Sequence, residues 1–407
     1  FDFDGSGSPC GLDAGTLWMA TEGLGVLKSS DLAGSWTGFN SGLAPSNRNV
    51  SAIAHTPQAA AFPLFIGLAD GPGFFKYDAG AGAWVSLNPI PSTTTRTVRI
   101  GMPPNHGAAY PKVFVGATDG LYLLDHAANG GLGSWSLETL PGTGAVTAIA
   151  FHPGFDGCAN QAMFAARFGS GVYRRVKTGP NPPCDNWAWV PVNTGLDSPY
   201  VTALSPAPDF STSGVLVAAT FDPTSSTAGG VYHSGNGGQN WTKVNGTGNT
   251  SLEDIHVRSL VMTSPAAGLT RTLVGTHKKR AFFSDNPTTQ VWTESDGFES
   301  GPSEVYAVAL SPVPKNTLCP PVSGGPVADV FVSGPEGVFW SNDSGESYRP
   351  LNRWALPAGV CPPLVRALYA FVNPNDCPVT KSLSGEAGVA TPVLLAGTDG
   401  AGIWFRC

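Results

Sequence analysis

The sequence predicts an all-β fold of the β-propeller class. A unit made of an apolar strand, a glycine-rich turn and an aromatic-tipped strand recurs eight times in 407 residues. Glycine (52) and proline (36) together exceed a fifth of the chain, which is typical of many tight turns between short strands. No segment has the pattern of a long helix. Such a period indicates one supersecondary element copied around an axis, each copy burying its face on the next.

Each repeat opens with an inner strand of pattern V-x-A-[IVL]. Its small third residue suits a crowded place near an axis, and most of these strands end in proline. Their first residues lie 48 to 60 residues apart and are Val50, Val98, Val146, Val201, Val257, Val305 and Val365.

Three further strands complete the repeat. The second strand and its turn to the third begin at Leu17, Leu64, Val113, Met163, Val215, Thr272, Val330 and Val393. The fourth, outer strand opens with an aromatic residue, namely Trp36, Trp84, Trp135, Trp187, Trp241, Trp292 or Tyr348. Four short antiparallel strands per repeat of roughly 50 residues are typical of a propeller blade, whereas a β-solenoid has shorter rungs without the outer aromatic.

We therefore expect a single propeller domain over residues 1–407. Eight copies of the second strand favour eight blades, and seven blades plus an accessory hairpin is the alternative. The repeats lie near 1–47, 48–95, 96–144, 145–199, 200–255, 256–303, 304–362 and 363–407. The first copy lacks an inner strand and the last lacks an outer one. We expect the open edge to be covered by Phe1–Asp4, by upstream residues or by another protein, because an unpaired strand edge is a template for pairing.

The composition narrows the classes of partner. Net charge is −7 and no basic run extends beyond Lys278–Arg280, which argues against a nucleic-acid partner. No apolar stretch approaches the ~20 residues of a membrane helix. The seven cysteines show no metal-ligand spacing, and six of them fall in predicted loops. This favours disulfides and a secreted location, extracellular or periplasmic.

Two disulfides follow from the position of the cysteines in the blades. Cys158 and Cys184 flank one blade in two loops that lie on the same face, and Cys377 and Cys407 repeat this relation in the last blade. A Cys319–Cys361 bond follows by elimination, which leaves Cys10 unpaired or bonded to another chain.

Several loops between the third and fourth strands resemble the Asp-box, or bacterial neuraminidase repeat, S-x-D-x-G-x-x-W. Residues 341–348 fit with Tyr for Trp, and residues 234–241 fit with Asn for Asp. The chain thus resembles the Asp-box propellers of the sialidase, sortilin and photosystem-assembly-factor class. The resemblance implies the fold and a structural role for the loop, in which the Ser or Asp side chain bonds backbone N–H groups and the aromatic residue packs under the neighbouring strand.

Three arginines are candidates for an anion-binding site. Arg99, Arg258 and Arg366 occupy the same position of three inner strands in the pattern above, so the fold places them at one mouth of the central tunnel. Guanidinium groups bind anions bidentately. The alternative is that each pairs with a nearby acid, such as Asp254 or Glu304.

One loop has the spacing of a calcium site. Oxygen-bearing side chains stand at positions 1, 3, 5 and 12 of a D-x-D-x-S-G segment, as Asp2, Asp4, Ser6 and Asp13. The alternative is a connection rich in Asx-turns. No other cofactor is expected.

No pair of facing carboxylates, nucleophile motif or phosphate-binding loop is found, so a non-catalytic role is expected. We expect a secreted propeller that acts as a protein-binding scaffold or as a subunit of a larger assembly. One alternative is a sialidase-like glycoside hydrolase or lyase, in which Arg, Tyr and paired acids converge at the tunnel mouth. Another is a carbohydrate-binding lectin that uses Trp340, Trp354 or Trp404 as stacking platforms.

Overall fold

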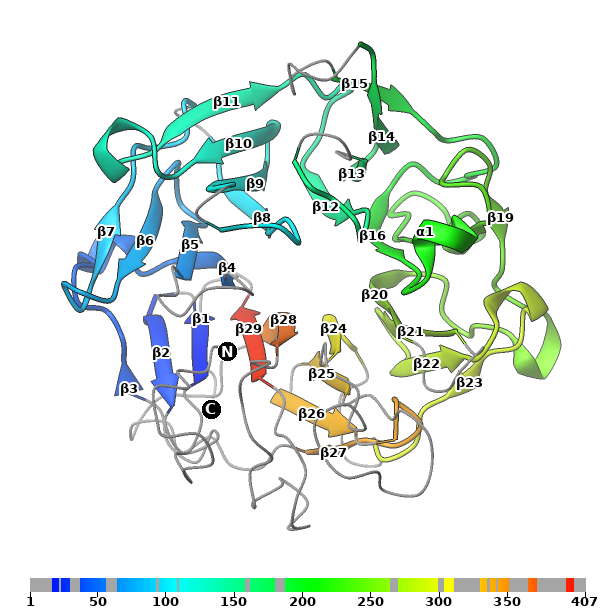
Figure 1. The fold of residues 1–407 in the computed structure, drawn as a ribbon. Helices are drawn as coiled ribbons and strands as arrows, with labels where there is room; N and C mark the ends of the chain where they lie inside the picture. The colour runs from blue at the N-terminus through cyan, green and yellow to red at the C-terminus, as the bar shows by residue number, and fades with distance from the viewer. Residues whose placement is uncertain are drawn as a thin grey trace, which may run out of the picture.

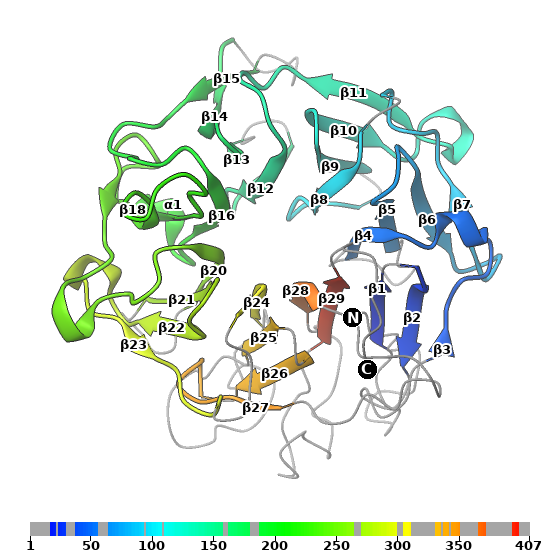
Figure 2. The same ribbon diagram turned by 180° about the vertical axis from the view of Figure 1, so that it is seen from behind.

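The structure is a computed structural model of the chain. It describes residues 17–21, 23–29, 37–55, 64–92, 95–107, 110–157, 162–179, 187–263, 270–298, 304–310, 330–334, 337–341, 343–350, 365–371 and 393–398. Seven sheets stand like blades around a common axis, with one strand of each at the centre of the ring (Figures 1 and 2). The predicted β-propeller is therefore confirmed.

Six of the sheets have four antiparallel strands, ordered from the centre outward as they follow in the chain. Blade 1 contains β4 (Val50–His55), β5 (Leu64–Leu68), β6 (Phe74–Asp78) and β7 (Ala83–Ser86). Blade 2 contains β8 (Thr97–Gly101), β9 (Lys112–Ala117), β10 (Leu121–Asp125) and β11 (Ser134–Glu138). Blade 3 contains β12 (Val146–Phe151), β13 (Met163–Arg167), β14 (Gly171–Lys177) and β15 (Trp187–Pro191).

The second half of the ring repeats this arrangement. Blade 4 contains β16 (Val201–Pro206), β17 (Leu216–Thr220), β18 (Gly230–Ser234) and β19 (Thr242–Lys243). Blade 5 contains β20 (Val257–Thr263), β21 (Arg271–Thr276), β22 (Ala281–Ser284) and β23 (Thr293–Glu294). Blade 6 contains β24 (Ala307–Leu310), β25 (Val330–Gly334), β26 (Gly337–Ser341) and β27 (Arg349–Pro350).

Blade 7 is built from both ends of the chain and corrects the expected number of blades. Its five strands are β28 (Val365–Phe371), β29 (Val393–Thr398), β1 (Leu17–Thr21), β2 (Gly25–Ser29) and β3 (Thr37–Gly38), in this order. β1 pairs in parallel with β29. The first and eighth copies of the second strand thus share one sheet, so the described residues form seven blades rather than eight. The strand edge that was expected to need Phe1–Asp4 or another protein is covered by β29.

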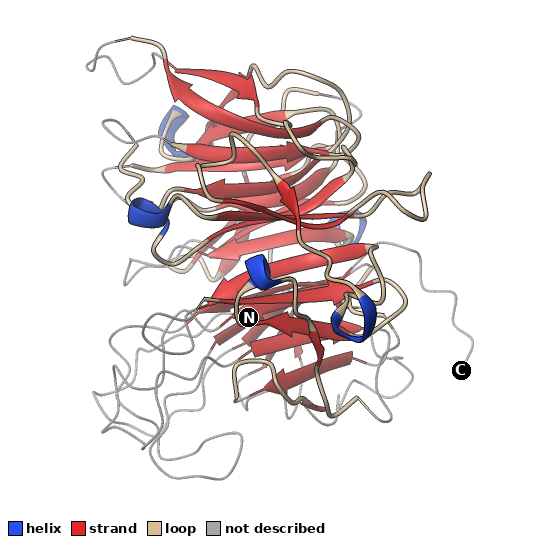
Figure 3. Cartoon of the chain, turned by 90° about the vertical axis from the view of Figure 1, so that its right-hand side faces the viewer, coloured by secondary structure: helices blue, strands red, loops and turns tan. Residues whose placement is uncertain are grey.

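The strand starts agree closely with the repeat pattern. β4, β12, β16, β20 and β28 begin at the predicted valines. Helices in the described residues are α1 (Phe210–Ser213) and 3-10 turns at Pro45–Asn47, Asn129–Gly131, Gly248–Thr250 and Pro287–Thr289, in loops outside the sheets (Figure 3). None of these helices is long and apolar enough to cross a membrane.

The hydrophobic core lies between adjacent blades. One cluster, for example, joins Val217 and Val231 of blade 4 to Val257 and Phe282 of blade 5. The second strands carry a small residue where the first residue of the next inner strand packs. A Cβ atom added at Gly67 would lie 2.3 Å from Thr97 Oγ1 of the next blade. Small residues at this position therefore let the blades approach closely.

The outer strands are joined by a repeated contact that we call the outer latch. The indole Nε1 of Trp84, Trp241 or Trp292 donates to a backbone carbonyl of the preceding blade, at Phe39 (2.8 Å), Val192 (2.8 Å) and Val244 (2.6 Å) respectively. Each indole is largely buried, so its N–H group needs an acceptor within the protein, and the latch carbonyl provides it.

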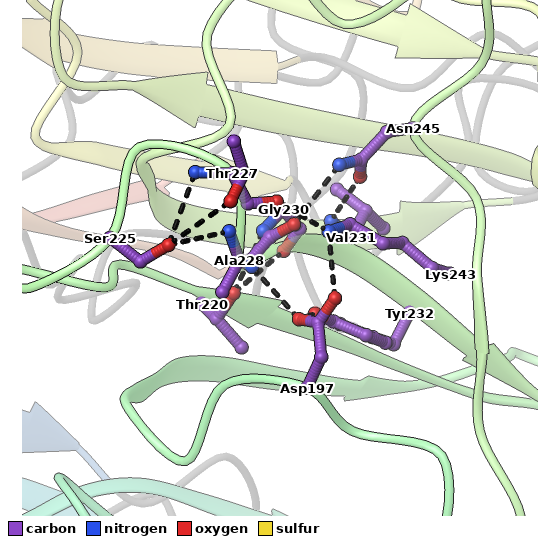
Figure 4. Close-up of polar contacts among 11 residues, drawn as sticks. Asp197, Thr220, Ser225, Thr227, Ala228, Gly230, Val231, Tyr232, Lys243 and Asn245 are labelled. Carbon is purple, nitrogen blue, oxygen red and sulfur yellow. Dashed lines mark hydrogen bonds and ion pairs between the residues drawn. The ribbon is translucent and has the colours of Figure 1, made fainter.

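An asparagine follows each of those carbonyl residues and completes the latch. Asn245 accepts from Val231 N at 2.8 Å and donates to Gly229 O at 3.0 Å (Figure 4). Asn40 and Asn193 make the same two bonds in blades 7 and 3. The asparagine therefore takes the place of an absent backbone partner where the third strand begins.

The two loops that resemble the Asp-box share one hydrogen-bond pattern. Ser234 Oγ accepts from Gly238 N at 2.9 Å, and Asn236 Oδ1 accepts from Asn240 N at 3.0 Å. In blade 6, Ser341 Oγ accepts from Gly345 N at 2.8 Å, and Asp343 Oδ1 accepts from Ser347 N at 2.9 Å. These bonds agree with the structural role that the resemblance implies.

Candidate functional site

The front face of the ring, defined as the face on which the inner strands begin, carries the candidate site. Six inner strands have a β-bulge at their second residue. In three of them the bulged residue is a hydroxyl residue that bonds the first residue of the next inner strand. Ser51 Oγ donates to Thr97 O at 2.7 Å, Thr147 Oγ1 to Val201 O at 2.6 Å, and Thr202 Oγ1 to Val257 O at 2.7 Å.

The other four inner strands have no serine or threonine at this position, which is held by Val98, Arg258, Tyr306 and Arg366. Arg258 stands at the bulge of β20, and Tyr306 precedes Ala307 of β24 in the corresponding place. The hydroxyl bond described between the blades of these two strands lies elsewhere, from Ser295 Oγ to Gly345 O at 2.7 Å. The Arg258 guanidinium carbon lies 5.3 Å from the ring centroid of Tyr306 and 5.3 Å from that of Phe221. Arg258 therefore contacts blades 4 and 6 through aromatic rings and not through a hydroxyl bond of the kind made by Thr202.

The strand register corrects the predicted equivalence of the three arginines. Thr97 pairs with Ala117 and Arg99 with Gly116, as Val257 pairs with Thr276 and Ser259 with Gly275. Arg99 is therefore equivalent to Ser259 and not to Arg258. The reason is that Thr97, which is buried, fills the first position of the inner strand that Val98 was expected to take.

Arg99 contacts the next inner strand, and the side chain of Arg366 lies outside the described residues. The exposed Arg99 donates from Nε to Thr147 O of blade 3 at 3.3 Å. Arg366 does share the bulge position of Arg258, but only its backbone is described. An anion site made by all three arginines thus stays a prediction.

Seven residues around Arg258 form what we call the mouth cluster. They come from the ends of blades 4, 5 and 6 on the front face, and they are Phe221, Asp254, His256, Arg258, His277, Glu304 and Tyr306.

Arg258 is held from several sides within this cluster. Its Nη2 donates to His277 Nδ1 at 2.5 Å, and Glu304 Oε2 lies 3.8 Å from the same nitrogen. The Phe221 ring lies 5.1 Å from the ring of His277, as centroids. The positive charge is therefore paired with a nearby acid, and the Glu304 partner named in the sequence analysis is found.

The histidines and the buried acid are fixed by local bonds. Asp254 accepts from His256 N at 3.0 Å and from Lys278 N at 2.5 Å, and its Oδ1 lies 3.1 Å from His256 Nδ1. Burial lowers the pKa of His277, and the Arg258 guanidinium lowers it further, against the opposite effect of Glu304 and Asp254. A neutral His277 agrees with its role as acceptor of the Arg258 bond.

Both carboxylates of the cluster have partners beside them. Each oxygen of the Asp254 carboxylate accepts from one backbone N–H group, and Glu304 faces a guanidinium and an imidazole. Among the described residues, no group of three or more His, Cys, Asp or Glu side chains is arranged to hold a metal ion.

The other predicted sites fall outside the described residues. This holds for the calcium loop of Asp2, Asp4, Ser6 and Asp13, for all seven cysteines and for Trp354 and Trp404. The side chain of Trp340 is likewise outside them. The disulfides Cys158–Cys184 and Cys377–Cys407 thus stay predictions.

Sequence reasoning did not assemble the mouth cluster. Its members are spread from residue 221 to residue 306 without a common motif. A usable signal was present, since Arg258 and Tyr306 replace the small hydroxyl residues found at 51, 147 and 202 in V-x-A.

Comparison with known proteins supports the fold alone. No family model and no curated protein matches the chain. Among solved structures, U3-55K has a TM-score of 0.50 at 12% identity, over 88% of this chain and 92% of that one. The extracellular domain of BT3049 from B. thetaiotaomicron has a TM-score of 0.51 at 12% identity, over 80% of this chain and 38% of that one.

A GH74 enzyme from Niastella koreensis is also similar, with a TM-score of 0.49 at 16% identity. The match covers 91% of this chain and 46% of the enzyme, so the chain spans about half the length of that protein. The sheet topology and the likenesses to U3-55K and the BT3049 domain identify the chain as a β-propeller.

Proposed function

We propose that the protein is a secreted, non-catalytic propeller that binds another protein through the mouth cluster. The observation that carries this proposal is the position of Arg258 between the rings of Phe221 and Tyr306 on the front face. Arginine and tyrosine are enriched among the residues that dominate protein–protein binding energy. The ring of seven blades is closed by the pairing of β1 with β29, which does not involve Arg258.

The bonding inside the cluster supports a binding role over a catalytic one. Asp254 and Glu304 both have partners within the cluster, so neither is left as an unengaged general acid or base. The secreted location is supported by the seven cysteines, which show no metal-ligand spacing.

Affinity capture with matched variants tests the proposal. The immobilised chain is exposed to an extract of the source organism, and the retained proteins are quantified for wild type, Arg258→Ala/Tyr306→Ala and Thr202→Val. We expect the double variant to lose retention of a specific protein by tenfold or more, while Thr202→Val, which alters the same strand position of a neighbouring blade, retains it. Equal retention by all three would contradict the proposal.

A sialidase-like hydrolase is a second candidate, because an arginine, a tyrosine and an acid do converge here as Arg258, Tyr306 and Glu304. A fluorogenic sialoside distinguishes the two candidates. Turnover by the wild type that disappears in Tyr306→Phe would favour the enzyme, whereas no turnover is expected for the binding protein.

A further inference from the structure

The outer strand of blade 2, β11, is a free sheet edge with unusual properties. It pairs with β10 along its whole length, from Asp125–Ser134 to Leu121–Glu138, and no strand of the described residues pairs with its other side. Figure 1 shows it at the rim of the ring. Alternate N–H and C=O groups of an edge strand point outward and are available to another strand.

Five of the other six outer strands are protected in ways that β11 is not, and the sixth, β7, is one residue shorter than β11. β3, β19, β23 and β27 have only two residues each, and β7 has four. β15 has five residues but ends in Pro191. β11 has five residues and contains no proline, no lysine and no bulge. Short length, proline, lysine and bulges are the devices that keep sheet edges from pairing.

The surface beside β11 is also the most apolar of the described rim. Leu137 of β11 is 59% exposed and Leu132, which precedes the strand, is 50% exposed. Only two other large apolar residues of the described chain are exposed, namely Val85 on the neighbouring outer strand and Val291. The one charge of β11 is neutralised within the chain, because Glu138 accepts from Arg175 at 3.2 Å and from Trp189 at 2.9 Å.

The sequence of β11 is complementary to itself in an antiparallel pair. A two-fold axis at Ser136 places Ser136 opposite its copy, Leu137 opposite Trp135, and Glu138 opposite Ser134. Trp135 and Leu137 project on the same side of the strand, so the axis makes two apolar cross-strand pairs. No two like charges face each other.

We propose that β11 pairs with β11 of a second copy of the chain, joining the two blades 2 into one continuous eight-stranded sheet across a two-fold dimer. The occupant is a second copy because this partner satisfies the free backbone groups, covers Leu137 and introduces no unpaired charge. The surface is separate from the mouth cluster, so the inference does not depend on the proposed function.

Sedimentation of the full chain tests the dimer, and a parallel run with a reductant excludes dimers linked by disulfides. We expect a concentration-dependent dimer for the wild type and at least a tenfold weaker association for Leu137→Lys, because lysine replaces the apolar contact at both ends of the pair. Val291→Lys is the matched control, since Val291 is also exposed but lies on blade 5, and it should dimerise like the wild type. A wild type that stays monomeric at 100 μM, or equal weakening by both variants, would overturn the proposal.

Cysteine cross-linking tests the register. Residues directly opposite in an antiparallel pair have Cα atoms about 4.5–5.5 Å apart, within the range of a disulfide. Ser136→Cys should therefore form covalent dimers with oxidised glutathione, above the background of the native cysteines in the wild type. Ser134→Cys, equally exposed but roughly 14 Å from its copy at ~3.4 Å per residue, should not. Equal cross-linking of the two variants would exclude the proposed axis.

Discussion

The outer latch and the mouth cluster join blades in opposite ways. The latch repeats with the period of the chain, since Trp84, Trp241 and Trp292 each bond a carbonyl 45 to 49 residues earlier. The mouth cluster occurs once and gathers residues of blades 4, 5 and 6. Both regions hold aromatic and polar side chains, yet only one follows the repeat.

We use this difference to distinguish contacts that stabilise the fold from contacts that are candidates for binding. In a repeat protein each interface contributes a similar share of the folding energy, so a contact that recurs is explained by folding alone. A contact that replaces the recurring one, as Arg258 replaces the hydroxyl of Thr202, needs another reason. We expect substitutions in the latch to unfold the protein and substitutions in the cluster to alter binding.

The largest loss of stability from a single substitution is expected for Gly195→Ala, beside the latch. Gly195 has φ +94°, and an added Cβ would lie 2.0 Å from Trp241 O of the next blade. The strained backbone and the overpacking together should cost about 3–5 kcal/mol of unfolding free energy. Urea unfolding measures it, with Gly82→Ala as control. Gly82 has φ +63° with no atom within 4 Å, so this control should cost only about 1–2 kcal/mol.

A buried histidine pair shows that a contact which occurs only once can also serve stability. His106 Nε2 lies 3.1 Å from His126 Nε2, beside Phe65 of blade 1. Burial lowers the pKa of each histidine to about 4. Between pH 6.5 and 4 the unfolded chain therefore binds protons that the folded chain does not, and stability falls as the pH falls.

We expect a loss of roughly 5 kcal/mol for the two histidines together between pH 7.5 and 4.5, measured by urea unfolding. The carboxylates with lowered pKa, such as Asp197, contribute at lower pH. Burial alone would raise the pKa of Asp197, but its bonds from Tyr232, Lys243 and Gly229 N lower it. His106→Gln/His126→Gln should flatten the slope, and His233→Gln should leave most of it. If the double variant keeps the same dependence of unfolding free energy on pH, then other groups cause the acid sensitivity.

Removal of the latch asparagine should have the next largest effect. Asn245→Ala leaves Val231 N and Gly229 O without their partner, which should cost about 2–3 kcal/mol. Asn240→Ala, at an exposed side chain, should change stability by less than about 0.5 kcal/mol. Thermal unfolding of both variants checks this, and similar losses would mean that the asparagine is not part of the latch.

The local pattern was sufficient to predict the strands but not how they combine. The outer aromatic residues and the inner valines stood out because each blade must bury the same face. The Asn that follows some of these aromatics by four residues, as Asn245 follows Trp241, was an equally regular signal that was overlooked. The number of blades was not predictable in this way, because β1 and β29 lie at opposite ends of the chain.

The candidate site was harder to predict for two physical reasons. A buried Thr97 fills the first position of β8 as well as valine does, so the valine pattern misplaced Arg99 by one residue. The mouth cluster also depends on loops of three blades that meet only in the folded ring. Arg258 was named from its strand position, whereas His277 and Phe221 have no local pattern that links them to it.

The smallest expected changes in stability come from substitutions at the two kinds of inner-strand contact, the hydroxyl bond of Thr202 and the ring contacts of Arg258. Thr202→Val removes the hydroxyl bond to Val257 O and should cost about 1 kcal/mol of unfolding free energy, with partner binding unchanged. Arg258→Ala should change stability by no more than about 1 kcal/mol, because Glu304 is partly exposed and is solvated once its partner is lost. The same variant should lower partner affinity tenfold or more. If instead Arg258→Ala destabilises the chain by several kcal/mol and leaves binding intact, then the cluster is a structural contact between blades and not a binding site.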